Sequence, residues 1–122
     1  VYAAAGGTGV GVLQTAADEG ILSIGVDSNQ NYLHPGKVLT SMIKRVDVAV
    51  YNAFTDGENL KSGFATWALA NDGVGYSLDE HNSSLMTSDI ISAVESAKSN
   101  IVSGELKVHD YMSDDSCPFL TF

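Results

Sequence analysis

The sequence predicts an α/β fold: an open, mostly parallel sheet flanked by helices in a three-layer arrangement. Short apolar and β-branched runs alternate with segments whose apolar residues recur at helical spacing. Glycine, asparagine and aspartate punctuate the boundaries between these segments. With 122 residues, of which 44% are hydrophobic and 17% charged, the chain is long and apolar enough for one folded domain.

The chain is expected to open with a strand, a glycine turn and a helix. Residues 1–5 form an apolar run that stops at Gly6 and Gly7. Thr8 is expected to cap a helix whose apolar residues keep 3.6-residue spacing as far as Gly20. This order brings a glycine turn and a helix N-terminus to the end of a strand.

Two more strands are expected before the middle of the chain. Residues 21–26 form a continuous apolar run, which is typical of a buried strand and delivers Asp27 to its C-terminal end. Residues 28–36 are polar and predict a loop, and residues 37–42 predict a short third strand. A helix capped by Thr40 or Ser41 should then run to 56–57, with an apolar stripe made by Ile43, Val46, Val50 and Phe54.

The second half predicts a hairpin, a long helix and a tail. The apolar runs 64–70 and 74–78 are expected to pair across residues 71–73, with Phe64 and Trp67 in the core. A helix should begin at Thr87 or Ser88 and stop at Gly104, with inward-facing residues Ile90, Ile91, Val94, Ala97, Ile101 and Val102. The remainder is expected to be a tail that docks through Val108, Tyr111, Met112 and Phe119.

Composition argues against several classes of function. The net charge of −9 and the lack of a Lys/Arg cluster argue against nucleic acid as a partner. His34, His81 and His109 lie on separate segments without metal-ligand spacing, and Cys117 is a single tail cysteine. No nucleophile elbow or phosphate loop occurs, and the acidic pair 79–80 is typical of a solvated loop. We therefore expect no enzyme, no metal and no cofactor.

Three segments are expected to meet at one edge of the sheet. Asp27 ends the second predicted strand, and Lys44 follows the third, so both should lie beyond the carboxyl ends of parallel strands. Gly7, Thr8 and Gly9 offer free N–H groups at a helix start. For each segment an explanation without ligand binding stays open: the glycines form a tight structural turn, Asp27 caps its own loop, and Lys44 is a solvated surface lysine.

Three blocks of the sequence resemble the basic membrane protein (Bmp/Med) family of ABC-transporter substrate-binding lipoproteins. They are Tyr2-Ala-Ala-Ala-Gly-Gly-Thr-Gly, Ile24-Gly-Val-Asp-Ser-Asn-Gln-Asn-Tyr and Pro35-Gly-Lys-Val-Leu-Thr-Ser-Met-Ile-Lys-Arg-Val-Asp-Val-Ala-Val-Tyr. The resemblance implies a type I periplasmic-binding-protein fold with two lobes that close on a ligand, and a periplasmic or membrane-anchored extracytoplasmic location. It implies that residues 1–110 are an incomplete C-terminal lobe and 111–122 a tail, without the N-terminal lobe or lipoprotein signal.

The resemblance also implies a solute and its contacts. The family includes purine nucleoside receptors that serve an ABC permease, so a purine nucleoside or similar molecule is the expected ligand. Asp27 matches the aspartate that binds the ribose, and Lys44 with Gly7, Thr8 and Gly9 is placed for similar contacts. The usual block reads Asp-Ser-Asp-Gln, whereas here Asn29 replaces the second aspartate.

A lobe on its own has a second interpretation. A site that covers one face of a ligand should bind it weakly, because good sites bury about 70–90% of the ligand surface. The alternative is a truncated, stand-alone oligomeric interaction protein that keeps the fold without ligand binding. Under either interpretation we expect a homodimer or swapped oligomer through the exposed sheet edge near residues 1–5 or through the cleft face.

Overall fold

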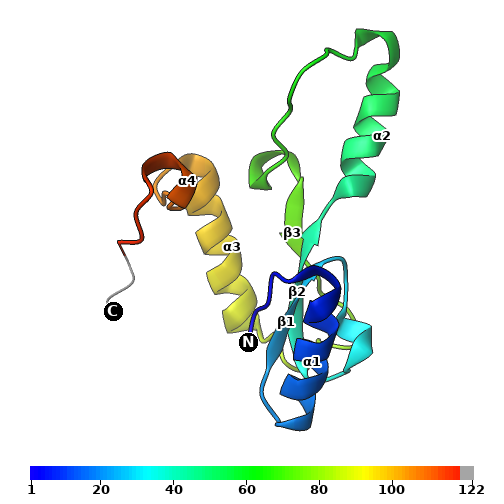
Figure 1. The fold of residues 1–122 in the computed structure, drawn as a ribbon, viewed down its shortest axis with the longest axis vertical. Helices are drawn as coiled ribbons and strands as arrows, with labels where there is room; N and C mark the ends of the chain where they lie inside the picture. The colour runs from blue at the N-terminus through cyan, green and yellow to red at the C-terminus, as the bar shows by residue number, and fades with distance from the viewer. Residues whose placement is uncertain (119–122) are drawn as a thin grey trace.

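The computed structural model describes residues 1–118, which form a small sheet and four α-helices (Figure 1). In chain order the elements are η1 (Gly6–Thr8), α1 (Gly9–Asp18), β1 (Ser23–Asp27), η2 (Asn31–Leu33), β2 (Val38–Lys44), α2 (Val46–Asp56), η3 (Gly57–Asn59), η4 (Leu69–Asn71), β3 (Val74–Tyr76), α3 (Ser88–Ser103) and α4 (Tyr111–Asp114). None of the helices in this described part is long and apolar enough to cross a membrane.

The sheet has three strands in the order β1-β2-β3. β1 and β2 are parallel, β2 and β3 are antiparallel, and Tyr2 adds an isolated parallel bridge to Ile24 on the outer side of β1. α1 packs against β1, whereas α2 and the loop after it extend away from the sheet (Figure 1). This arrangement confirms the predicted α/β class with a mostly parallel sheet.

The first predicted strand is wrong in extent. Residues 1–5 contribute one bridge, supported by the Val1 ammonium donating to Leu22 O at 2.6 Å and Ile24 N donating to Val1 O at 2.8 Å. The alanines that follow offer little side chain to pack on a pleated surface. Thr8 does not cap α1 through its side chain, because η1 already gives its backbone a helical conformation (φ −64°, ψ −26°).

The boundary between β2 and α2 lies later than predicted. Thr40 and Ser41 do not cap a helix, because both lie within β2 and bond across to Ser77. The Thr40 hydroxyl donates to Ser77 O at 2.7 Å, and Ser41 N donates to the Ser77 hydroxyl at 3.0 Å. β2 therefore continues to Lys44, and α2 begins at Val46.

The predicted strand over 64–70 and its hairpin are also wrong. β3 takes the free edge of β2, which leaves the earlier apolar run without a strand to pair with. Phe64 is fully exposed and Trp67 is half-buried, so the expectation that both lie in the core fails for Phe64. Gly73 lies so close to Trp67 that a Cβ there would collide with its side chain and backbone.

The last long helix is where the sequence places it. The Thr87 hydroxyl accepts a hydrogen bond from Ile90 N at 3.4 Å, and Gly104 ends α3 with φ +82°. Its apolar side is only partly covered, however, because Ile90, Val94 and Val102 stay 36–50% exposed.

The tail is not docked in the predicted way. Residues 111–114 form the short helix α4, and Val108, Tyr111 and Met112 are all exposed. Phe119, the fourth residue of the predicted contact, lies outside the described residues.

The interior is as much polar as apolar. The buried hydrophobic residues of the described part are Leu13, Ala16, Val26, Val38 and Met86, and the buried polar residues are Ser23, Asn31, Ser41, Ser77 and Asn82. By contrast, Val46, Val50, Tyr51 and Phe54 leave the apolar side of α2 49–82% exposed. Hydrogen bonds between loops therefore hold the centre of this fold together with a small apolar core.

Candidate functional site

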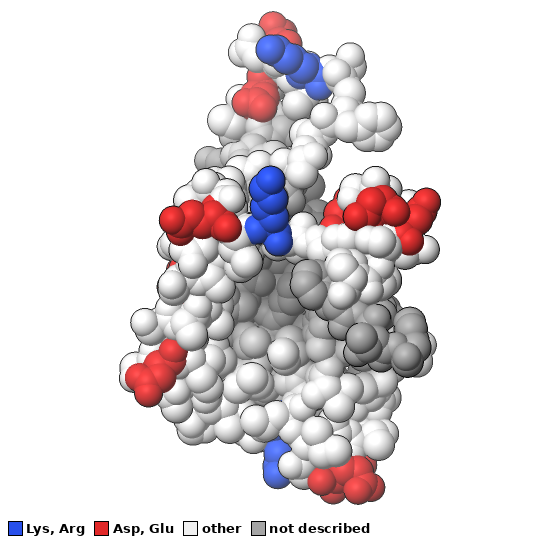
Figure 2. Space-filling model, turned by 90° about the vertical axis from the view of Figure 1, so that its left-hand side faces the viewer, with Lys and Arg blue, Asp and Glu red and all other residues white. Residues whose placement is uncertain are grey.

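A cleft of about 1080 Å³ separates the sheet from α3. Met42 and Tyr76, which pair across β2 and β3, line it on the sheet side, and Val94, Ala97 and Ile101 line it on the α3 side. The molecular face on the α3 side is hollowed at its centre, with charged side chains above and below the hollow (Figure 2). The cleft is large enough for a small organic molecule and offers it apolar walls.

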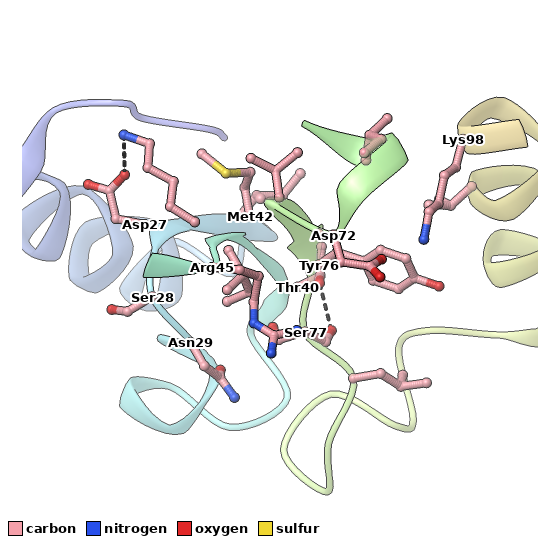
Figure 3. A pocket seen from close by; sticks show the side chains of 18 of the residues that line it. Asp27, Ser28, Asn29, Thr40, Met42, Arg45, Asp72, Tyr76, Ser77 and Lys98 are labelled. Carbon is pink, nitrogen blue, oxygen red and sulfur yellow. Dashed lines mark hydrogen bonds and ion pairs between the residues drawn. The ribbon is translucent and has the colours of Figure 1, made fainter. Parts of the chain in front are cut away.

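Asp27 and Lys44 lie together at one end of this cleft. Asp27 is the last residue of β1 and Lys44 the last residue of β2, and Asp27 pairs with Ile43 in the parallel register. The Lys44 Nζ lies 2.7 Å from Asp27 Oδ1, an ion pair marked by the dashed line at Asp27 in Figure 3. The structure therefore brings together two of the predicted site residues, at the strand ends where ligands bind in open α/β sheets.

This ion pair faces solvent and keeps bonding capacity for a ligand. The side chains of Lys44 and Asp27 are 58% and 50% exposed. The hydrogen bond and negative charge of Asp27 raise the pKa of Lys44 above its ordinary value. Exposed ion pairs contribute little to stability, whereas an ammonium has three donors and a carboxylate several acceptor positions. The pair can thus accept from one ligand hydroxyl and donate to another.

The backbone at Asp27 is unusual for a strand end. Its φ of +71° lies in the left-handed region, which non-glycine residues rarely enter and aspartate tolerates better than most. Ser28 N donates to Val26 O at 2.9 Å, which closes a tight turn around Asp27. Such conformations persist only where the surroundings hold them, and they concentrate at functional positions.

A polar network holds the loop that follows Asp27. Gln30 Oε1 accepts from Val26 N at 2.9 Å, and Gln30 N donates to the Ser41 hydroxyl at 3.0 Å. The Ser41 hydroxyl in turn donates to Asn31 Oδ1 at 2.8 Å, and both residues are fully buried. These contacts fix the loop against β2.

Asp79 holds the same loop from the other side. One of its carboxylate oxygens, Oδ2, accepts from the side-chain amides of Asn29 at 2.7 Å and Asn31 at 3.1 Å. Its other oxygen, Oδ1, accepts from His81 N at 2.8 Å. These hydrogen bonds, the one from Asn29 first among them, lower the pKa of Asp79. Asp79 therefore lies in a loop, as predicted, but its carboxylate is hydrogen-bonded on both oxygens instead of being simply solvated.

The part of the cleft away from Asp27 carries polar groups that sequence reasoning missed. The Tyr76 hydroxyl donates to Glu95 Oε1 at 2.8 Å and connects β3 to α3. That hydrogen bond, followed by burial, raises the pKa of Tyr76. Figure 3 shows Lys98 on α3 at the end of the cleft opposite Asp27, with Tyr76 on the sheet between them. No local sequence signal identifies them, because their shared position depends on how α3 lies over the sheet.

The glycine turn lies elsewhere. Gly7, Thr8 and Gly9 are not among the described residues that line the large cleft. Thr8 lines a smaller hollow of about 500 Å³ beside α1, together with Val1 and Val12. A ligand contact by Gly7, Thr8 or Gly9 therefore stays a prediction. Within residues 1–118, no group of three or more His, Cys, Asp or Glu side chains is placed to hold a metal ion.

Comparison with known proteins gives a consistent result. The family model described as "ABC transporter substrate-binding protein PnrA-like", Bmp, matches residues 1–111. The chain is 33% identical to basic membrane protein D of Borreliella burgdorferi, over 95% of this chain and 36% of that protein. It is 35% identical to the "ABC transporter nucleoside-binding protein BmpA" of Lactococcus lactis, over 88% of this chain and 35% of that protein.

A solved structure shares the fold. It is an ABC transporter system solute-binding protein from Aeropyrum pernix, with a TM-score of 0.69 and 28% identity over 93% of this chain and 42% of that chain. The present chain spans about a third of the length of the curated relatives it matches.

Proposed function

Because the chain belongs to the Bmp family of PnrA-like ABC transporter substrate-binding proteins, we propose that its cleft binds a nucleoside as a transported solute and does not transform it. The observation that carries this proposal is the Asp27–Lys44 pair, which lies half-exposed at the strand ends with a 2.7 Å contact. The nucleoside-binding description of the Lactococcus relative supports the class of ligand.

The chemistry of the pair suits a ribose. Asp27 accepts hydrogen bonds from the two neighbouring hydroxyls of the sugar, and Lys44 donates to one of their oxygens. The apolar groups that line the cleft, Met42 and Val94 among them, provide a surface for the base. A sugar phosphate fits less well, because the chain's net charge of −9 repels an added dianion.

The open shape of the cleft limits what the chain does alone. The sheet and α3 form two walls of the cleft and leave it open to solvent elsewhere. This chain matches only about a third of the length of its relatives. We place the full receptor outside the cytoplasmic membrane, delivering its solute to an ABC permease. Under this proposal the isolated chain binds a nucleoside weakly, with a second lobe supplying the opposite face.

The test is isothermal titration of the purified chain with inosine, guanosine and adenosine. Saturable binding of at least one nucleoside in the millimolar range or tighter is expected, and Asp27→Ala should weaken it at least tenfold. Asp18→Ala, which removes an exposed carboxylate at the end of α1, is the matched control and should leave the affinity unchanged. Equal affinities for Asp27→Ala and the parent chain would contradict the proposal.

A second candidate is self-association without ligand binding. The observation in its favour is the exposed apolar side of α2, where Val50, Tyr51 and Phe54 are 49–82% accessible to solvent. Sedimentation equilibrium at micromolar concentrations tests it, with a Phe54→Ser variant as the matched comparison. A mass of one chain throughout would reject this candidate.

A further inference from the structure

Asp79 is separated from Asp27 by more than fifty residues of sequence, yet it contacts the loop that begins at Asp27. The contact to Asn29, at 2.7 Å, is short for an amide donating to a carboxylate, and the same oxygen accepts from Asn31. Asn31 N also donates to Asn29 Oδ1 at 3.0 Å, so the two asparagines are bonded to each other as well as to Asp79. The carboxylate therefore fixes both ends of a three-residue segment.

This segment determines how the chain leaves β1. Between Val26 and Gln30, the side-chain oxygen of Gln30 accepts the Val26 N–H, and Ser28 N bonds back to Val26 O. Asp27 lies inside this turn with its left-handed φ of +71°. The carboxylate of Asp27 points to Lys44 only while the turn holds this conformation, because a change to ordinary strand angles would move the side chain to a different direction.

Asp79 is itself held in place. Its N–H donates to Asn82 Oδ1 at 2.9 Å, and Asn82 Nδ2 donates to Leu39 O at 2.9 Å and Ser77 O at 3.1 Å. Asn82 is fully buried. Asn82 therefore holds the turn that carries Asp79 against the sheet. The hydrogen bonds of Asp79 in turn fix the loop after Asp27 relative to the sheet.

We propose that Asp79 is a positioning residue for the Asp27–Lys44 pair: by binding Asn29 and Asn31 it holds the Asp27 turn so that the carboxylate meets Lys44. The role of this pair in ligand binding rests on the proposed function, whereas the positioning itself does not. The asparagine at position 29 is the complement of Asp79, because a second carboxylate there would face the first at hydrogen-bond distance.

The experiment reads the pair directly, without a ligand. The ¹⁵Nζ chemical shift of Lys44 and the exchange rate of its ammonium protons report whether it is hydrogen-bonded to Asp27, and Asp27→Asn gives the reference values for an unpaired Lys44. Asp79→Asn is expected to move both signals at least halfway to that reference. Glu80→Gln removes the neighbouring exposed carboxylate, whose recorded contact is to His81 at 3.7 Å, and should leave both signals unchanged.

Two further variants keep the test decisive. Asn29→Ala deletes the 2.7 Å contact while Asp79 retains its contacts with Asn31 and His81. It should shift the Lys44 signals in the same direction, and it replaces Asp79→Asn as the test if that variant does not fold. N29D should disturb the Lys44 signals more than Asn29→Ala, and adding D79N should recover part of the loss. Lys44 signals that stay at the parent values in folded Asp79→Asn, or in Asn29→Ala, would overturn the inference.

The same samples separate this inference from the proposed function. Lys44 signals that shift as expected in a chain that binds no nucleoside would leave the positioning role standing and remove the solute-binding proposal. Nucleoside binding that depends on Asp27, together with Lys44 signals that do not shift in folded Asp79→Asn, would remove the positioning role and leave the solute-binding proposal standing.

Discussion

Replacing Asn82 with alanine is predicted to destabilise the fold by about 2–4 kcal/mol, although no apolar contact defines this position. Asn82 is fully buried, and its side chain makes three hydrogen bonds: it accepts from Asp79 N and donates to Leu39 O and Ser77 O. Ser77 O keeps the Thr40 hydroxyl at 2.7 Å, so two groups lose a partner in the variant. Each buried group left unpaired costs about 1–3 kcal/mol, and because both of these hydrogen bonds are only partly buried, the lower part of the doubled range, about 2–4 kcal/mol, is expected.

Urea unfolding followed by circular dichroism measures this loss. With a slope of about 2 kcal/mol per molar urea, the unfolding midpoint should fall by about 1–2 M. Asn59→Ala, an exposed asparagine in η3, is the control and should change stability by less than about 0.5 kcal/mol. Asn82→Asp keeps the volume but turns a carboxylate toward two carbonyl oxygens, and it should be at least as damaging as alanine. Wild-type stability in either Asn82 variant would refute the reasoning.

Other predictions concern the turn at Asp27 and the ends of the helices. Gly25→Ala should destabilise the fold by about 1–3 kcal/mol, because its Cβ would lie 2.5 Å from the Ser41 hydroxyl. Gly11→Ala in α1 places a Cβ that meets nothing within 4 Å, so it should stabilise the fold by about 0.5–1 kcal/mol; thermal melts measure both. Thr87→Ala should cost about 1 kcal/mol and lower Tm, since it removes the N-cap of α3. The Asp79 carboxylate has a lower pKa in the folded chain than in the unfolded chain, so its ionised form stabilises the fold at pH values above the unfolded-state pKa. That contribution is lost as the pH falls through the folded-state pKa. The Tm difference between the parent chain and Asp79→Asn should therefore shrink below about pH 4.

Local signals were sufficient for several elements and for the position of Asp27. The apolar run before Asp27 predicts β1, and Thr87 with Gly104 delimits α3 to within a residue at each end. Because adjacent parallel strands end at the same edge, the order of elements alone brings Asp27 near Lys44. The sequence did not predict that Lys44 lies in the strand itself, because its apolar neighbours fit a strand and a helix equally well.

Nonlocal contacts account for the parts that could not be predicted. Asp79 and Asn82 form hydrogen bonds to residues between 43 and 50 positions away, besides those within their own turn. Such hydrogen bonds leave no periodic pattern in the sequence. The run 64–70 has the composition of a strand, but β3 occupies the edge of β2 that it would need. Pairing partners are chosen by the whole fold, so a segment's own composition does not determine them.

The two kinds of surface in this chain are held by different forces. The edge that carries Asp27 is fixed by hydrogen bonds among the 28–31 loop, Ser41 and the 77–82 turn. Within the described residues, the apolar side of α2 has no comparable cover. The spacing predicted a helix here but started it too early, since Ile43 of the predicted stripe lies in β2. Periodicity shows which side of a helix is apolar and not what packs on it. Changes on α2, such as at Phe54, share no described hydrogen bond with the Asp27 turn, so their effects on stability should add to those of the turn without coupling. The geometry of the candidate site therefore depends on polar contacts within this chain, whereas the burial of the apolar side of α2 depends on what packs against it.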